Sequence, residues 1–163
     1  MPIMLHVTCY MLHDYNVTCY MKLTIHTDGG ARGNPGPAAI GVVISDKRSV
    51  IRYSKFIGKA TNNEAEYQAI IFALQKVKAL FGKKKAKEME IEIKTDSELV
   101  FKQLNHQYKI KEKNLIPFFI KVWNLEMDFK KVFFTHIPRE KNKEADRLVN
   151  QELDKRTAPT IFN

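Results

Sequence analysis

Four carboxylates lie either at the end of a predicted strand or on the apolar side of a predicted helix. Asp28 and Asp96 each close an alternating apolar segment, and Asp28 runs directly into a glycine-rich turn. Glu66 and Asp146 are each followed by apolar residues at helical spacings, so they extend the stripes with which two helices would face a sheet. A carboxylate on such a stripe is costly unless it is protonated, paired or bound to a metal ion. The spacing therefore marks these acids as candidates for a shared site.

Convergent carboxylates favour a particular chemistry. Open α/β sheets bind ligands at the carboxyl ends of their strands, and acids gathered there repel one another unless cations lie between them. Oxygen donors without cysteine suit Mg²⁺ or Mn²⁺, and two such ions close together form the phosphodiester-cleaving arrangement of polymerases and nucleases. Two acids have ordinary alternatives: Asp96 as the N-cap of the next helix, and Asp146 as a surface charge beside Arg147 or Lys143.

The elements that position these acids follow from periodicity and turn residues. Alternation predicts strands at 22–28, 38–45, 49–58, 88–96 and 131–137, and helical spacing predicts helices at 61–82, 97–105, 115–129 and 142–156. The first helix is expected to start at Thr61 or Asn62 and to end at Gly82, before a basic loop at 83–87. The order βββαβααβα predicts an α/β fold: a mixed five-stranded sheet, with three antiparallel strands and then parallel crossovers, and helices on its faces.

Composition narrows the class of partner. The 163 residues carry a formal net charge of +9, which favours a polyanion and above all nucleic acid, although a lysine-rich soluble surface would give the same value. No apolar run is long enough to cross a membrane, so we expect no membrane partner. Cys9 and Cys19 make no framework, which favours a reducing, cytoplasmic location. Residues 1–20 are a leader of open role, and the motif "VTCYM" occurs at 7–11 and again at 17–21. Residues 21–156 are the domain, and 157–163 are a tail.

Four blocks in order carry a family resemblance: "TDGGARGNPGPAAIG", "TNNEAEYQAI", "KTDSELVFKQLN" and "HIPREKNKEADRL". Together they resemble the ribonuclease H family, type 1, in its compact archaeal and bacterial form, over about residues 21–156. The resemblance implies an endonuclease that hydrolyses the RNA strand of RNA–DNA hybrids by two-metal-ion catalysis, leaving 5′-phosphate and 3′-hydroxyl ends. It implies two Mg²⁺ ions per site, with Mn²⁺ as a substitute, and we expect a monomer. The family's metal-binding carboxylates fall on Asp28, Glu66, Asp96 and Asp146.

The resemblance also implies auxiliary residues. A family histidine thought to aid product release or the leaving group falls on His136, and an arginine with that role in archaeal relatives falls on Arg139, so which one serves stays open. Helix capping is the alternative for Asn62 and Asn63, and capping and binding are compatible. Backbone close to the first acid would contact RNA 2′-hydroxyls, which distinguish RNA from DNA. The residues expected to contact the hybrid are Gly29, Gly30, Asn34, Thr61, Asn62, Asn63 and Ser97.

Two departures from the family pattern bear on substrate binding. Glu98 stands where bacterial members commonly have glutamine, so a base contact from that position is not expected to carry over. The basic protrusion is missing, and only residues 106–114 occupy its place; lysines at 109, 111 and 113, or at 83–87, are candidates to replace its attraction for phosphate. The rival interpretations are a module that binds hybrids without cutting them, another nuclease or integrase of this fold, and a detached reverse-transcriptase domain.

Overall fold

The computed structural model describes residues 21–157. The predictions for the leader at 1–20 and for residues 158–163 of the tail lie outside the described residues. Within the described chain, no helix is both long and apolar enough to cross a membrane.

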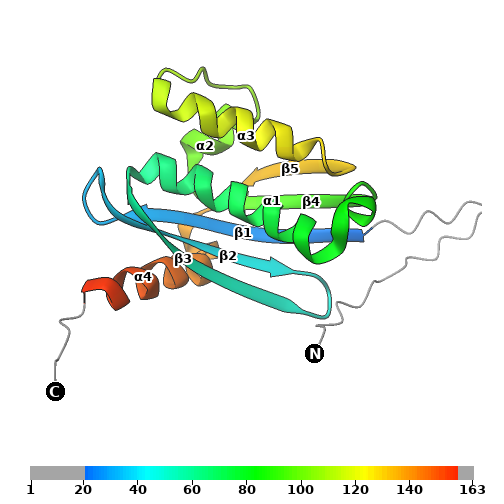
Figure 1. The fold of residues 1–163 in the computed structure, drawn as a ribbon, viewed down its shortest axis with the longest axis horizontal. Helices are drawn as coiled ribbons and strands as arrows, with labels where there is room; N and C mark the ends of the chain where they lie inside the picture. Colours follow the sequence, from blue (N-terminus) through cyan, green and yellow to red (C-terminus); the bar gives the residue numbers. More distant parts are fainter. Residues whose placement is uncertain (1–20, 158–163) are drawn as a thin grey trace, which may run out of the picture.

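A single five-stranded sheet forms the centre of the domain (Figure 1). Its strands lie in the order β3-β2-β1-β4-β5. β1 pairs antiparallel with β2 and β2 with β3, whereas β1 pairs parallel with β4 and β4 with β5. The predicted sheet, with three antiparallel strands followed by parallel crossovers, is confirmed. The strands are β1 (Met21–Ala31), β2 (Gly36–Ser45), β3 (Val50–Ala60), β4 (Met89–Thr95) and β5 (Lys131–His136).

Helices cover both faces of this sheet. The long helix α1 (Asn62–Ala86) packs on one face together with α2 (Glu98–Leu104) and α3 (Ile116–Glu126), and they share the main apolar core. Helix α4 (Lys143–Thr157) lies on the opposite face and packs mainly against β2 (Figure 1). One-turn 3₁₀ helices at Lys113–Leu115 and Arg139–Lys141 lead into α3 and α4.

Helix α1 begins where the sequence predicts and is interrupted at the predicted end. The Thr61 hydroxyl accepts from the Glu64 N–H and the Glu64 carboxylate accepts from the Thr61 N–H, so Thr61 is the cap, in a capping box. The predicted break at Gly82 is present, since Gly82 has non-helical backbone angles (φ 79°). The basic loop predicted at 83–87 is wrong, because the chain resumes a helix after Gly82 and continues it to Ala86.

Helix α3 is apolar on two sides. Val122 is buried, and the partly buried Phe118 and Phe119 pack against the core. The opposite side carries large apolar residues that are 41–63% exposed, a set that we call the α3 stripe: Ile116, Ile120, Trp123 and Met127.

Candidate active site

Three predicted acids meet at one edge of the sheet. Asp28, Glu66 and Asp96 each offer a carboxylate oxygen, and these oxygens all lie within 4.8 Å of one another. Two of the acids arrive there because β1 and β4 run parallel in register, with Thr27 opposite Thr95, so that the residues that follow are neighbours. The parallel pairing therefore brings together side chains that are far apart in the sequence.

Glu66 reaches this edge because α1 lies directly on β1. A Cβ added to Gly29 would lie 2.2 Å from the carbonyl carbon of Ala65, the residue before Glu66, so only glycine permits this approach. Gly29 is buried beneath the helix. The structure thus gives Gly29 a packing role beside Asp28, and its predicted contact with RNA stays a prediction.

A second glycine brings α4 close from the other face. Gly41 of β2 pairs with Asp28 of β1. A Cβ at Gly41 would lie 2.2 Å from the carbonyl oxygen of Ala145, the residue before Asp146. The helices that carry Glu66 and Asp146 are therefore both held against the sheet by close backbone contact next to the first acid.

The acids perturb one another strongly. Asp28 is only 8% exposed, and burial, followed by the charges of Asp96 and Asp146, raises its pKa to about 6. Glu66 is 9% exposed, and burial, with Asp28 and Asp96 adding to it, raises the pKa of Glu66 well above its ordinary value. Both carboxyls therefore hold protons more tightly than free side chains do, because their negative charges are poorly solvated and lie close together.

The donor set fits a divalent cation. One carboxylate oxygen of Glu66, Oε2, is buried without a hydrogen-bond partner. An unpartnered buried oxygen is costly, and a cation or a proton is the ligand that would satisfy it. Carboxylate oxygens are the donors that Mg²⁺ and Mn²⁺ prefer. The residues that would hold such a cation are Asp28, Glu66 and Asp96.

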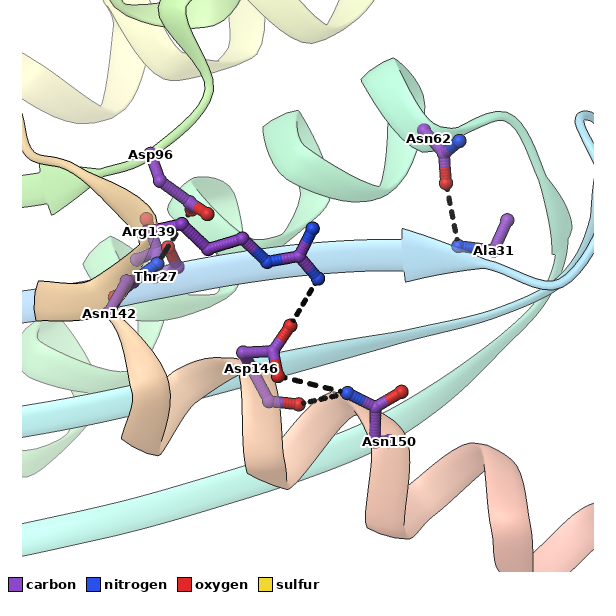
Figure 2. Close-up of polar contacts among 8 residues, drawn as sticks. All are labelled: Thr27, Ala31, Asn62, Asp96, Arg139, Asn142, Asp146 and Asn150. Atoms are coloured by element: carbon purple, nitrogen blue, oxygen red, sulfur yellow. Dashed lines mark hydrogen bonds and ion pairs between the residues drawn. The ribbon is translucent and has the colours of Figure 1, made fainter.

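Asp146 stands beside this group and is not one of the three that meet within 4.8 Å. Its carboxylate accepts a hydrogen bond from the Arg139 guanidinium at 2.7 Å and another from the Asn150 amide at 3.1 Å. In Figure 2 the Arg139 side chain extends between Asp96 and Asp146. The partner of Asp146 is therefore Arg139, whereas the sequence suggested Arg147 or Lys143. The sequence had indicated Arg139 only as a candidate for aiding product release.

Asn142 was not predicted, and it anchors one of the acids. Its buried side-chain amide donates to the Asp96 carboxylate at 2.7 Å and to the Thr27 carbonyl at 2.9 Å (Figure 2). Asn142 therefore ties the loop before α4 to both parallel strands and fixes the direction of Asp96. A sequence signal exists, because Asn142 lies one helical turn before Asp146, but an asparagine there also fits an ordinary helix start.

The alternative interpretation of Asp96 as a helix cap is wrong. The cap of α2 is Ser97, whose hydroxyl accepts from the Val100 N–H.

His136 lies next to Asp96, with its Nε2 3.3 Å from the Asp96 carbonyl oxygen and its ring 5.7 Å from that of Phe101. Both His136 and Arg139 are therefore exposed at the edge of the site, and the choice between them stays open.

Most of the residues predicted to contact the substrate lie in the β1–β2 loop and around the start of α1. The Asn62 side-chain oxygen Oδ1 accepts from the Ala31 N–H at 2.8 Å (Figure 2). The Asn34 Oδ1 accepts from the Asn62 N–H at 3.0 Å, so these side chains brace the β1–β2 loop against the start of α1. Neither Asn62 nor Asn63 caps α1. Gly30 lies toward α4, since a Cβ there would meet Val149 at 3.2 Å.

Known proteins resemble this chain in sequence and in fold. Residues 26–152 match the family described as Reverse transcriptase-like. The solved structure of LC11-RNase H1 in complex with an RNA/DNA hybrid is 47% identical, with a TM-score of 0.78, over 83% of this chain and 99% of that one. RNase H1 of the halophilic archaeon Halobacterium salinarum is 38% identical, with a TM-score of 0.74, over 82% of this chain and 98% of that one.

The curated relatives extend beyond the part of their sequence that this chain matches. A bifunctional protein of Mycobacterium tuberculosis is 38% identical over 82% of this chain but only 36% of its own length. Ribonuclease HI of Halobacterium salinarum is 41% identical over 82% of this chain and 65% of its own length. The chain thus spans about a third of the mycobacterial relative that it matches.

The mixed sheet, the acids at its parallel strand ends and the match over residues 26–152 define a domain of the Reverse transcriptase-like class. Within that class the two solved structures named above are ribonucleases H of type 1. The chain belongs to the ribonuclease H family, type 1, a family of hydrolases. It has the compact form, because only residues 105–115 separate α2 from α3.

Proposed function

We propose that this chain is an endonuclease that hydrolyses the RNA strand of RNA–DNA hybrids at the site formed by Asp28, Glu66, Asp96 and Asp146. The observation that supports this most directly is the convergence of three acids from β1, α1 and the end of β4 within 4.8 Å. The solved relative at 47% identity is described in complex with an RNA/DNA hybrid. Burying carboxylates close to one another destabilises the fold, and this cluster has no evident structural use. The cluster therefore favours a catalytic domain over a module that only binds hybrids.

The acids are proposed to hold two divalent cations, Mg²⁺ with Mn²⁺ as substitute. Asp28 is central, since it lies between the helices that carry Glu66 and Asp146. Such ions supply an activated water and stabilise the charge that develops on the phosphate and the leaving 3′ oxygen. Products would carry 5′-phosphate and 3′-hydroxyl ends.

The other residues have supporting roles in this proposal. Asn142 holds Asp96 in one orientation through its 2.7 Å hydrogen bond. Arg139 pairs with Asp146 at 2.7 Å and extends toward solvent, where it can exchange that partner for a phosphate or a departing product. His136 can transfer a proton at the same rim, beside Asp96. Whether His136 or Arg139 serves product release is decided by testing each variant for burst kinetics.

Hybrid binding is assigned to the rim formed by the β1–β2 loop, the start of α1 and α2. The backbone at Gly30 and the side chains of Asn34, Thr61, Asn62, Asn63 and Ser97 are the proposed contacts. A groove of about 380 Å³ adjoins this rim, and Glu112 in its lining accepts from the Asn63 amide at 3.4 Å. It offers an exposed aromatic ring and cations where the family's basic protrusion would stand: Tyr108, Lys109 and Lys111.

A cleavage assay tests this function. Labelled RNA–DNA hybrid, double-stranded RNA and double-stranded DNA are incubated with the protein in Mg²⁺, in Mn²⁺ and in EDTA. We expect cleavage of the hybrid's RNA strand alone, with either metal, and its loss in Asp96→Asn, whose matched control is the distant Asp128→Asn. Hybrid binding by the wild type without cleavage would favour the binding module, and near-wild-type cleavage by Asp96→Asn would refute the assignment of the site.

A further inference from the structure

A second concave surface lies apart from the acids. A groove of about 500 Å³ opens between the β1–β2 loop and the end of β3, and Arg32, Phe56 and Lys59 contribute to its lining. The last turn of α4 adds Arg156, whose guanidinium carbon lies 5.0 Å from the centre of the Phe56 ring. We call Arg32, Phe56, Lys59 and Arg156 the basic corner.

The corner is built into the fold. Phe56 packs on the cluster formed by β2 and α4, so the aromatic ring is anchored from below. The β2–β3 register shifts here: Ala38 pairs with Gly58 and Ala39 with Phe56, which leaves Ile57 as an extra residue. Such a bulge bends the strand and redirects its side chains. The groove and its aromatic floor are therefore products of the backbone path.

The charges of the corner suit a phosphate chain. Arg32 forms an ion pair with Asp154 that holds it in place, yet 39% of its side chain stays exposed. Lys59 and Arg156 are both exposed. A guanidinium group binds phosphate through paired hydrogen bonds and stacks on flat rings, and an aromatic floor between cations is a feature of nucleic-acid grooves. Arg32 and Lys59 thus line the groove and Arg156 lies over its aromatic residue, while Asp154 offsets the charge of Arg32.

The corner lies within reach of a nucleic acid bound at the acids. Asp146 and Arg156 are on the same helix, and ten residues of helix span about 15 Å. That length corresponds to about four base pairs of duplex, at ~3.4 Å for each pair. Figure 1 shows the β1–β2 loop, the end of β3 and the last turn of α4 at the same end of the molecule.

We propose that the basic corner is a phosphate-binding subsite that holds the backbone of the hybrid about four base pairs from the cleaved bond. The inference rests on the proposed function, because it takes the hybrid as the ligand. It assigns a role to Arg32, in the first family block, and to Lys59 and Arg156, outside the four blocks, and compensates in part for the missing basic protrusion.

Binding in EDTA, where the RNA is expected to stay intact, tests this subsite. Arg156→Ala and Lys59→Gln are compared with Lys131→Ala, a matched control whose ammonium lies 4.4 Å from the Phe133 ring at the start of β5. For a hybrid of about twenty base pairs, each corner variant is expected to lower the slope of log affinity against log salt by about 0.9, because it neutralises one phosphate fewer. For a hybrid that ends within two base pairs of the cleaved bond on both sides, it should change nothing.

The outcomes separate the two proposals. Equal salt slopes for Arg156→Ala, Lys59→Gln and Lys131→Ala on the long hybrid would overturn the subsite while leaving cleavage intact. Failure of the wild type to bind or cut any hybrid would overturn the proposed function itself. Thermal unfolding of each variant shows whether Arg156→Ala has disturbed α4. If it has, the salt slope of Lys59→Gln, a substitution on β3, decides whether the subsite exists.

Discussion

Replacing the central acid should make the metal-free protein more stable. Burial, with the charges of Asp96 and Asp146, raises the pKa of Asp28 from 3.8 to about 6. A carboxyl with a raised pKa binds its proton more tightly in the folded state, so the free energy of unfolding falls as pH rises from about 4 to about 6 and stays low above that. Asparagine has nearly the same shape and no charge, so Asp28→Asn removes this cost.

The size of the effect follows from the pKa. Each tenfold change in proton affinity is worth about 1.4 kcal/mol, so a pKa of about 6 in place of 3.8 corresponds to about 3 kcal/mol above pH 6. Because Asp28 is only 8% exposed, solvent screening reduces this value little. In EDTA at pH 8, Asp28→Asn should therefore exceed the wild type by up to about 3 kcal/mol, and below pH 4 the two should coincide.

Urea unfolding followed by far-ultraviolet circular dichroism measures this difference. Asp46→Asn is the matched control of opposite sign: partial desolvation raises the pKa of Asp46, but the N–H groups of Arg48 and Ser49 outweigh it and lower the pKa, so this variant should lose stability at pH 8. Adding Mg²⁺ should stabilise the wild type and not Asp28→Asn, because only the wild type keeps the full donor set. An Asp28→Asn variant no more stable than the wild type in EDTA at pH 8 would refute the reasoning.

Two further substitutions test how the acids are positioned. Gly41→Ala places a Cβ 2.2 Å from the Ala145 carbonyl oxygen, so α4 must move; we expect a loss of about 1–3 kcal/mol in urea unfolding and of most hybrid cleavage, and wild-type cleavage would show that Asp146 needs no such placement. Asn142→Ala frees Asp96 and leaves the Thr27 carbonyl without its donor; we expect about 1–2 kcal/mol of destabilisation and a lower kcat with KM little changed, whereas an unchanged kcat would contradict a positioning role.

The sequence predicted the fold because its periodicities are local and strong. Leu23, Ile25 and Thr27 alternate as β1 requires and are all buried, and Glu66 lies on the buried stripe of α1 as its spacing indicates. The element order then limited the sheet to a few topologies. The convergence of Asp28 and Asp96 was predictable for the same reason, since the parallel pairing of β1 with β4 ends at Thr27 and Thr95, just before them. The predicted strand end at Asp28 was wrong, because β1 continues to Ala31 in its pairing with β2.

Other features depend on contacts that spacing does not encode. Asn142 binds Asp96 across 46 residues, and an asparagine before a helix has many uses. The sequence predicted Gly29 as a contact with the hybrid and indicated no role for Gly41, whereas in the structure the backbones of α1 and α4 lie directly against them. Gly82 breaks the helix as a glycine there predicts, but the short helical stretch from there to Ala86 has no signal in the spacing of the lysine-rich sequence.

The α3 stripe has a practical consequence for spectroscopy. Trp123 is the only tryptophan in the chain, and it is 55% exposed on the outer side of α3. We therefore expect its fluorescence to report on the solvent around one helix face, with emission in the folded protein close to that of a hydrated indole. Unfolding would shift this signal only slightly, whereas anything that covers the stripe would shift it to shorter wavelength, so the same residue is a weak probe of folding and a sensitive probe of contact.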